Sequence, residues 1–304
     1  MINKVNNIVI IGAGPAGLSL SASLKIAGID HIILEANDYP GGQSGIINNR
    51  LDDFIIGNIT DGNMLVSKFQ EFIHHHNLPV LYKCVVQSLD PIGKSILIKQ
   101  KNSEKELSYN TLVVATGCRM KLDTTFSGIG FDDHIFYRIS KYINDFSNKT
   151  VSVVGSGDNA LMAAIKLSEI AGKVYLINRS SKWKARKDLV DTIKATRKIE
   201  FFTNYRLKTL IGTSKLDEII IEDGFNEKTI KTEKIVYKIG YTPNTEFLKG
   251  VVKTNDLGYI NANEHFETSE KDIYAIGDVI SSSLKRISIA LSHGTLLGNN
   301  LINN

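Results

Sequence analysis

A short glycine-rich segment near the start of the chain has the residue types and spacing to bind a phosphate. Residues 12–17, Gly-Ala-Gly-Pro-Ala-Gly, follow the apolar run 8–11 and precede a helical stretch at 18–24. In such a unit the first glycine permits the turn, the second lets a pyrophosphate approach the backbone, and the third lets the helix pack on the strand. The helix N-terminus adds free N–H groups. We therefore predict a dinucleotide site at Gly12, Gly14, Pro15, Ala16 and Gly17.

A carboxylate follows this segment at the distance expected for a dinucleotide fold. The apolar run 32–34 ends in Glu35, which is 23 residues after Gly12. A carboxylate at this place accepts hydrogen bonds from ribose hydroxyls. Glycine turns between strand and helix also occur for packing alone, but here the strand, the helix and the spaced acid agree. We interpret the segment as a binding site and include Glu35 in it.

A second segment repeats the pattern with a basic ending. The run 151–154 leads into Gly155-Ser156-Gly157-Asp158-Asn159-Ala160, and the next strand, 174–177, ends in Asn178-Arg179 without an acid. Arginine and lysine pair with a ribose 2′-phosphate, which an acid would repel. The alternative interpretation is that the cations after this point, Lys182, Lys184, Arg186 and Lys187, form the solvent-exposed start of a helix. The pattern favours NADP over NAD, with candidate residues Gly155, Gly157, Asp158, Asn159, Ala160, Arg179 and Lys184. One acidic and one basic site together indicate tightly held FAD and exchanging NADPH.

Composition narrows the class of protein. The 304 residues suffice for about two domains, and 42% hydrophobic with 22% charged residues is typical of a globular chain. A net charge of +4 gives no reason to expect a nucleic-acid partner. We see no apolar run of membrane-span length and no secretory start in residues 1–7, so we expect a cytoplasmic protein without a membrane partner.

The cysteine and histidine content argues against metal and disulfide chemistry. Cys84 and Cys118 are the only cysteines, so the chain has no CxxC pair and no zinc-ligand cluster. The consecutive histidines 74–76 point in different directions on a helix and cannot converge on one ion. We expect no metal site. We also expect no redox role for Cys118, since dithiol chemistry needs two sulfurs, and a structural role for His293.

Taken together, several motifs resemble those of the thioredoxin-reductase-like flavoproteins, a group that includes a short type of ferredoxin-NADP reductase. The motifs are the two glycine segments, Glu35 and residues 41–43, 115–117, 240–244 and 274–279. The resemblance covers nearly the whole chain. It implies an α/β fold with two Rossmann-like, three-layer (ββα) dinucleotide-binding domains. An NAD(P)H-binding domain, 118–244, would be inserted into a discontinuous FAD-binding domain, 1–117 and 245–304, and the protein would be a homodimer.

The resemblance also implies further residues for FAD. Gly42 and Gln43 would lie beside the flavin, and a strand of the FAD domain would close at Ala115, Thr116 and Gly117. Gly277 and Asp278 would hold the ribityl and pyrophosphate region. The start of the last helix, whose backbone meets the flavin ring in this group, corresponds to Arg286, Ile287 and Ser288.

This sequence departs from thioredoxin reductases at two places. Those enzymes carry a CxxCD segment, and here Ile129 and Asp132 occupy the cysteine places while Asp133 keeps the acid. Asp133 is therefore the one candidate proton relay. In the basic motif Ser180 replaces one arginine, which leaves NADH use open. The residues leading to the second glycine segment, with Asp145, Phe146 and Lys149, resemble ferredoxin-NADP reductases instead.

These patterns predict an NAD(P)H-dependent flavoprotein oxidoreductase. We expect hydride transfer from NADPH to FAD and delivery of electrons to an acceptor that is not a disulfide, namely ferredoxin, flavodoxin or a small molecule. The cofactor performs such chemistry, so the lack of a nucleophile constellation is no objection. The sequence also leaves two alternative functions open. A flavin-dependent monooxygenase also pairs an FAD turn with an NADPH turn, and a non-catalytic flavin-binding protein would bind FAD without being reduced by NAD(P)H.

Overall fold

The computed structural model describes residues 6–47, 59–126, 128, 130–248, 250–282 and 284–303. The chain divides into two compact units. One consists of Met1–Arg119 together with Thr242–Asn304, and the other of Met120–Tyr241. No helix in the described part of the chain is both long and apolar enough to cross a membrane.

The first unit is built on a parallel sheet. Its strands are β1 (Asn6–Ile11), β2 (His31–Leu34), β3 (Val80–Leu81), β6 (Ser103–Val114) and β17 (Ile273–Ala275), in the order β3-β2-β1-β6-β17. Ile10 of β1 lies between Ile33 of β2 and Val113 of β6. All three side chains are fully buried, as expected for a parallel sheet covered on both faces. This explains why the apolar run in β1 is continuous rather than alternating.

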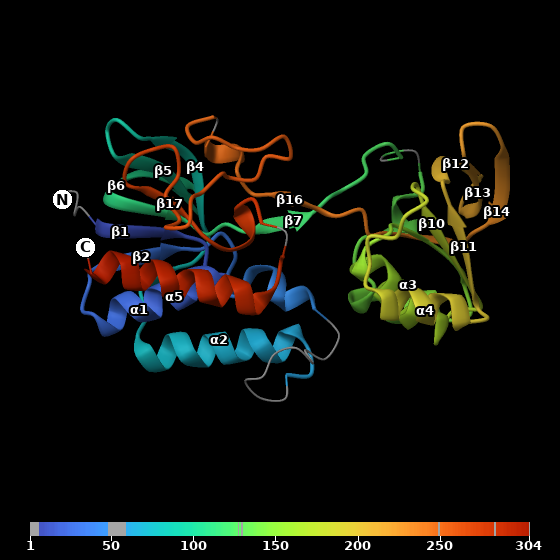
Figure 1. The fold of residues 1–304 in the computed structure, drawn as a ribbon, viewed down its shortest axis with the longest axis horizontal. Coiled ribbons are helices and arrows are strands. Elements are labelled where there is room, and N and C mark those ends of the chain that lie inside the picture. Colours follow the sequence, from blue (N-terminus) through green and yellow to red (C-terminus); the bar gives the residue numbers. More distant parts are fainter. Residues whose placement is uncertain are drawn as a thin grey trace. The chain divides into compact units, whose positions relative to one another are not determined.

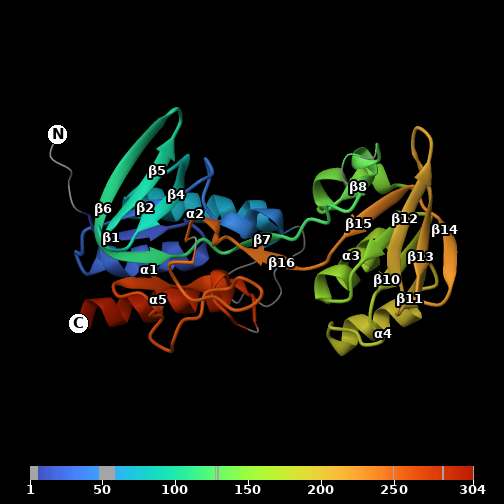
Figure 2. The ribbon, with the colours of Figure 1, turned by 90° about the horizontal axis from the view of Figure 1, so that it is seen from above.

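Strand β6 joins two layers because its two halves have different partners. Residues 103–108 pair with β5 (Ser95–Gln100), which pairs in turn with β4 (Cys84–Asp90) in an antiparallel sheet. From Tyr109 onward β6 pairs with β1 instead. The antiparallel strands lie on one side of the parallel sheet and the helices on the other (Figure 1), and Figure 2 views this unit from the side of the antiparallel strands. The layer order is therefore antiparallel sheet, parallel sheet, helices.

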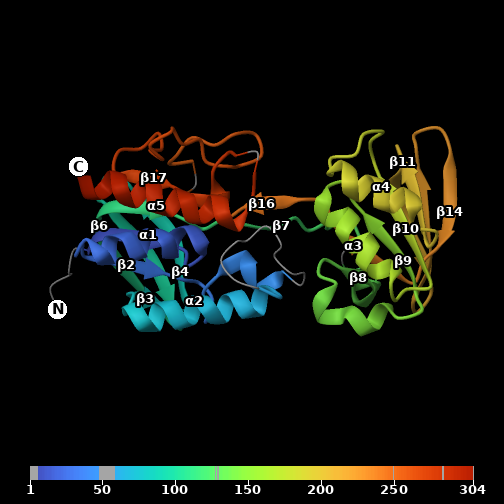
Figure 3. The same cartoon turned by 60° about the horizontal axis from the view of Figure 1, so that its bottom comes forward.

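Helices α1 (Pro15–Ile26) and α5 (Ile287–Asn303) lie side by side under the parallel sheet (Figure 3). The Ser19 hydroxyl of α1 donates a 2.8 Å hydrogen bond to the Leu291 carbonyl of α5. Helix α2 (Gly62–His76) begins with the Asp61 carboxylate, which accepts from the Met64 N–H. Three short 3₁₀ turns complete the unit: η1 (Gly42–Ile46), η4 (Glu246–Leu248) and η5 (Gly277–Val279).

The second unit repeats the three layers. Its parallel sheet has the order β11-β10-β9-β15-β8, formed by β11 (Ile199–Thr203), β10 (Lys173–Asn178), β9 (Thr150–Val154), β15 (Lys234–Tyr237) and β8 (Ile135–Phe136). Helices α3 (Asp158–Ser168) and α4 (Lys187–Ala195) cover one face. Along β10, Val174 and Leu176 join the helix-side core, whereas Tyr175 and Ile177 join the core on the opposite face. Two further 3₁₀ segments, η2 (Asp132–His134) and η3 (Ser140–Phe146), flank β8.

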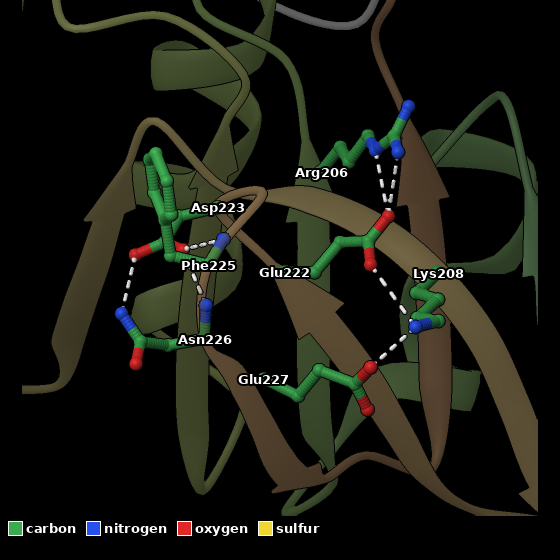
Figure 4. Close-up of polar contacts among 7 residues, drawn as sticks. All are labelled: Arg206, Lys208, Glu222, Asp223, Phe225, Asn226 and Glu227. Atoms are coloured by element: carbon green, nitrogen blue, oxygen red, sulfur yellow. Dashed lines mark hydrogen bonds and ion pairs between the residues drawn. The ribbon is translucent and has the colours of Figure 1, made fainter.

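The opposite face is covered by an antiparallel sheet of β12 (Arg206–Gly212), β13 (Leu216–Glu222) and β14 (Glu227–Lys231). Its edge carries an ion-pair network, in which Glu222 pairs with Arg206 at 2.7 Å and with Lys208 at 3.1 Å (Figure 4). Lys208 also pairs with Glu227. These cations hold the pKa of the Glu222 carboxyl below its usual value, Lys208 contributing most. The network links the ends of three strands.

Two strand segments connect the units, β7 (Cys118–Met120) and β16 (Tyr241–Pro243), and they pair with each other. Beside this pair, Asn244 is bonded to the turn that follows β6. Its side-chain amide donates to the Thr116 carbonyl, and its backbone carbonyl accepts from the Thr116 hydroxyl, both at 2.8 Å. Its backbone N–H donates to the Gly117 carbonyl at 3.1 Å. Asn244 therefore links the two segments that connect the units, one after β6 and the other after β16.

Candidate functional site

The first glycine segment forms the turn between β1 and α1, and its glycines differ in what surrounds them. Gly12 has φ +110°, and a Cβ there would lie 2.5 Å from the Ala115 carbonyl oxygen. A Cβ on Gly17 would lie 2.0 Å from the Gly12 carbonyl oxygen. In contrast, no described atom lies within 4 Å of a Cβ built on Gly14, which caps α1 without a side-chain hydrogen bond. Packing requires the first and third glycines, and the second leaves room for a ligand.

Pro15 and Ala16 form the first turn of α1 directly after that open position. Proline suits the first helical position, where no intrahelical partner for its missing N–H exists. The N–H groups of this turn have no side-chain cap. The turn therefore fits an anionic pyrophosphate, which supplies the acceptors that such N–H groups lack.

Glu35 is held at the end of β2, and only 5% of it is exposed. One carboxylate oxygen accepts from the Ala13 N–H at 2.8 Å, and the other accepts from the backbone and side-chain N–H groups of Asn37, each at 2.8 Å. A carboxylate offers about four acceptor sites. These three bonds fix its orientation beside the glycine turn and leave room for a ribose hydroxyl.

Gln43 brings a buried acceptor to the same place. The loop before it is tied to the glycine turn, because the Gly41 N–H donates to the Ala13 carbonyl at 2.7 Å. A Cβ on Gly42 would lie 3.9 Å from the Gly14 Cα. No described group donates to the buried Gln43 Oε1. A buried acceptor without a donor costs about 1–3 kcal/mol, so this oxygen fits a donor on a bound molecule.

Two further turns meet the first glycine segment. The Ala115 N–H donates to the Ile11 carbonyl at 2.9 Å, which brings residues 115–117 next to Gly12. Gly277 in η5 has φ +75°, and a Cβ there would lie 2.8 Å from the Ala16 Cβ. Glycine therefore lets η5 approach the start of α1. The structure thus collects residues 12–17, 35, 41–43, 115–117 and 277–278 at the carboxyl ends of the parallel strands.

Asp278 and its neighbours form a group of titratable side chains at this edge. Burial raises the pKa of the Asp278 carboxyl, and the nearby Lys285 ammonium opposes that rise. Lys285 Nζ donates to the carbonyls of Asp278 and Ile280, at 2.9 and 2.7 Å, and lies 4.2 Å from the centre of the Tyr259 ring. These bonds bring the start of α5 to η5, and the next residues are the three predicted at the helix start, Arg286, Ile287 and Ser288. Arg286 and Ser288 are exposed and Ile287 is partly buried.

The second glycine segment has the same construction. Gly155 follows β9, and a Cβ there would lie 2.4 Å from the Lys238 carbonyl oxygen and 2.8 Å from the Ala160 Cβ. No described atom lies within 4 Å of a Cβ on Gly157, which caps α3 without a side-chain bond. As in the first unit, packing excludes a side chain at the first position and leaves the second open.

Asp158 and Asn159, the next two residues predicted for this site, both have protein partners. The Asp158 carboxylate accepts from the Arg186 N–H at 2.8 Å. The Asn159 amide donates to the Tyr241 hydroxyl at 2.9 Å. Both side chains therefore stabilise the protein around the second glycine turn.

The basic loop after β10 is folded against the second glycine turn. The Lys184 N–H donates to the Ser156 carbonyl at 2.9 Å. Asn178, 1% exposed, accepts from the Ser180 N–H at 3.0 Å and donates to the Lys182 carbonyl at 3.2 Å. Its side chain therefore holds the loop conformation through these two hydrogen bonds. Asn178 also occupies the position at which an NAD-type site would carry an acidic residue. Arg179, at the start of this loop, and Lys184, later in it, are both exposed.

The candidate proton relay lies in the second unit, outside both glycine turns. Asp133 is an exposed residue of η2, and its backbone carbonyl accepts from Lys234 Nζ at 3.3 Å. The neighbouring Asp132 carboxylate accepts from the Gly128 N–H at 3.3 Å. Ile129, the other residue at a cysteine place, lies outside the described residues.

Both thiols are buried and unpaired. Cys84 is 2% exposed and Cys118 is 3% exposed, and neither forms a disulfide. Burial raises the pKa of Cys84 to about 11. Burial and the nearby Asp278 carboxylate raise the pKa of Cys118 to about 12, against the opposing effect of Lys285. Within the described ranges, no group of three or more His, Cys, Asp or Glu side chains could hold a metal ion.

Four residues that hold these turns were not among the predicted site residues: Asn178, Asn244, Lys285 and His293. Asn244 belongs to a recognised motif, so its position could have been included. Lys285 contacts carbonyls only five and seven residues before it, which a turn of unknown geometry does not reveal in the sequence. His293 meets its partner through the position of α5 beside η5, which has no local sequence signal.

Known proteins resemble this chain along its whole length. A thioredoxin reductase of Mycoplasmopsis pulmonis is 29% identical over 319 residues, covering 99% of this chain and 98% of that protein. A 34.2 kDa protein in a rubredoxin operon of Clostridium pasteurianum is 26% identical, covering 96% and 95%. The crystal structure of Lactococcus lactis thioredoxin reductase matches with a TM-score of 0.88 at 21% identity and covers 98% of both chains. The structural match confirms the predicted α/β two-domain dinucleotide-binding fold.

A family model gives the classification. Residues 6–294 match the model described as pyridine nucleotide-disulphide oxidoreductase. Its thioredoxin-reductase-like members are NAD(P)H-dependent flavoprotein oxidoreductases that use FAD and NADPH, which confirms the predicted enzyme class and cofactors. Since the matched region contains both glycine turns and η5, and the sequence has no CxxC pair, this chain belongs to the pyridine nucleotide-disulphide oxidoreductase family as a thioredoxin-reductase-like member without that pair.

Proposed function

We propose that the protein transfers a hydride from NADPH to FAD and then passes electrons to an acceptor that is not a protein disulfide. Ferredoxin, flavodoxin or a small oxidant would fill that role. The observation that carries the proposal is the state of the cysteines: the sequence holds two, and both are buried and unpaired.

The buried thiols argue against a disulfide relay on chemical grounds. Thiol–disulfide exchange needs an attacking thiolate and a second sulfur that resolves the mixed disulfide. With pKa values of about 11 for Cys84 and about 12 for Cys118, almost no thiolate forms at neutral pH. Electrons would then leave the flavin directly for the acceptor.

We assign FAD to the first unit and NADPH to the second. The N-terminus of α1 would hold the FAD pyrophosphate, Glu35 the ribose, and Gln43 Oε1 a donor on the cofactor. The turns 115–117 and 277–278 and the start of α5 would enclose the remainder. When bound, FAD supplies the hydride acceptance and the electron delivery. The protein supplies position, and the apolar strands behind these turns exclude water.

In the second unit the N-terminus of α3 would hold the NADPH pyrophosphate, and Arg179 and Lys184 its 2′-phosphate. Lysine is a weaker bidentate phosphate partner than arginine, and Ser180 stands where relatives of this type carry a cation. We therefore propose a preference for NADPH that is smaller than a full set of arginines would give. Asp133 is proposed as a proton donor to acceptors that take up protons with electrons.

A reduction assay and an acceptor panel test the proposal. NADPH is mixed anaerobically with the FAD-loaded protein, and the loss of flavin absorbance is followed. Ferredoxin, flavodoxin, quinones, free flavin, thioredoxin disulfide and rubredoxin are then compared as oxidants, the last because one relative belongs to a rubredoxin operon. Fast bleaching and reoxidation by a non-disulfide acceptor support the proposal. Efficient turnover of thioredoxin disulfide contradicts it, and FAD binding without bleaching favours the non-catalytic alternative.

A further inference from the structure

His293 of α5 makes a direct bond to the turn assigned to FAD. Its Nδ1 atom accepts a hydrogen bond from the Gly277 N–H at 3.2 Å. The imidazole ring is partly buried and lies 5.0 Å from the Phe266 ring, centre to centre. This contact joins the last helix to η5, from residues 16 positions apart in the sequence.

The buried Gly277 N–H has no strand partner, and His293 supplies its acceptor. The preceding residue, Ile276, donates its own N–H to the Val114 carbonyl at 3.0 Å, in continuation of the sheet. At Gly277 the backbone turns to φ +75° and leaves the sheet. Gly277 is buried, and an unpaired N–H in such a place destabilises a turn. His293 therefore replaces a strand partner at the point where the chain turns toward Asp278.

The bond fixes the protonation state of the ring. A backbone N–H can only donate, so Nδ1 must carry a lone pair, and the proton of the neutral ring lies on Nε2. A protonated imidazole has N–H groups at both nitrogens and cannot accept this bond. Among the described residues, Lys285 is the charged group whose electrostatic effect lowers the pKa of His293. Its Nζ donates to the Asp278 carbonyl in η5. Phe266 on the facing loop and Ala16 on α1 beside Gly277 carry no charge.

We propose that His293 is a positioning residue for FAD, whose neutral ring holds the Gly277–Asp278 turn in the geometry that binds the cofactor. Protonation of the ring breaks this bond and releases the turn, so FAD binds more weakly in acid. The inference rests on the proposed FAD site in the first unit.

The direction of the pH effect follows from linkage. Burial, assisted by Lys285, lowers the pKa of His293 from its ordinary value of 6.5. The neutral form that binds FAD therefore predominates at pH 7 and is lost as the pH falls through this lowered pKa. If FAD requires the neutral ring, affinity falls by up to about tenfold per pH unit below the pKa of the FAD-free protein.

Titration of FAD into the FAD-free protein between pH 5 and pH 8, followed by flavin fluorescence, tests the proposal. The wild-type protein is compared with His293→Asn, whose side-chain oxygen stands where Nδ1 stands but does not titrate in this range. His293→Leu removes the acceptor, and His265→Asn is the control, since His265 is an exposed histidine of the same unit. His31, whose pKa burial also lowers, and Asp278, whose pKa burial raises, are present in every variant, so a difference between the variants belongs to His293.

The expected wild-type dissociation constant rises at least about threefold from pH 7 to pH 5. His293→Asn binds FAD near the wild-type level at pH 7 with a flat profile. His293→Leu binds about tenfold more weakly at every pH, and thermal unfolding shows whether it is folded. A flat wild-type profile, or a His293→Asn profile that matches the wild type, overturns the role of His293. Absence of FAD binding by the wild type at pH 7.5 overturns the FAD site itself.

Discussion

At the scale of single residues, the two outer positions of the first glycine turn serve packing and the middle one faces open space. Gly12→Ala places a methyl group 2.5 Å from the Ala115 oxygen in a backbone conformation that alanine rarely adopts. Gly14→Ala meets no described atom within 4 Å. We expect Gly12→Ala to lower the free energy of unfolding by about 2 kcal/mol or more, and Gly14→Ala to change it by less than about 1 kcal/mol.

FAD affinity distinguishes these two roles further. The Gly14→Ala methyl group occupies the space where a pyrophosphate would approach, so a protein of nearly normal stability should bind FAD at least about tenfold more weakly. Urea unfolding of the FAD-free proteins and flavin fluorescence titration provide the two quantities. Normal FAD affinity in Gly14→Ala would contradict the assignment of this turn.

The role of Asp133 is also decided at the residue scale. Asp133→Asn removes the carboxyl proton but keeps the shape, so turnover with a quinone, which takes up protons, should fall at least about tenfold. Turnover with ferricyanide, which takes up electrons alone, should stay within about twofold of wild type by the same argument. Asp132→Asn, on the adjacent exposed residue, is the matched control. Equal losses with both oxidants would show that Asp133 is not a proton relay.

At the scale of elements, the loop after β10 carries the cofactor preference. Lys184 is bonded through its N–H to the Ser156 carbonyl of the second glycine turn, and its side chain is exposed. Lys184→Glu should raise KM for NADPH at least about tenfold, because a carboxylate repels the 2′-phosphate. KM for NADH should change less than about twofold, since that phosphate is absent. Lys182→Glu in the same loop is the control, and a loss shared equally by both nucleotides would refute the assignment.

The two segments that connect the units, at β7 and β16, also have a testable structural role. Asn244→Ala removes the 2.8 Å bond to the Thr116 carbonyl and the acceptor for Arg119, also at 2.8 Å. We expect a loss of about 1–3 kcal/mol in unfolding free energy, since the Thr116 carbonyl is left without this donor. FAD affinity should fall with it, because residues 115–117 line the proposed site. Asn110→Ala, on an exposed position of β6, should leave both quantities near wild type.

How far the sequence predicts these elements depends on whether the signal is local. Both glycine turns, Glu35 and the missing acid at Asn178 lie within single strand–turn–helix units, where spacing alone specifies the geometry. The bonds of Asn244 to Thr116 span 128 positions, and that of His293 to Gly277 depends on how α5 packs. No periodicity records such contacts. The same reasoning explains why the sequence showed the absence of an acid after β10 but not that Asn178 is buried and shapes the basic loop.

At the scale of the whole molecule, two units of the same three-layer construction each carry one glycine turn whose middle position is open. A two-nucleotide enzyme needs such a pair, and family membership establishes the flavoprotein class. What separates this chain from a disulfide reductase is the lack of any accessible thiol. Under the proposed function, the acceptor would therefore take electrons from the reduced flavin without a relay through sulfur.

Electron transfer without sulfur is tested by a double variant without cysteine, Cys84→Ser and Cys118→Ser, loaded with FAD and mixed anaerobically with NADPH. We predict that flavin bleaching and reoxidation by the best non-disulfide acceptor both proceed within about twofold of wild type, since neither thiol takes part. Urea unfolding of the variant controls for the loss of two buried side chains. If the folded variant is reduced normally but no longer passes electrons on, the thiols take part in the reaction, and electron transfer without sulfur is contradicted.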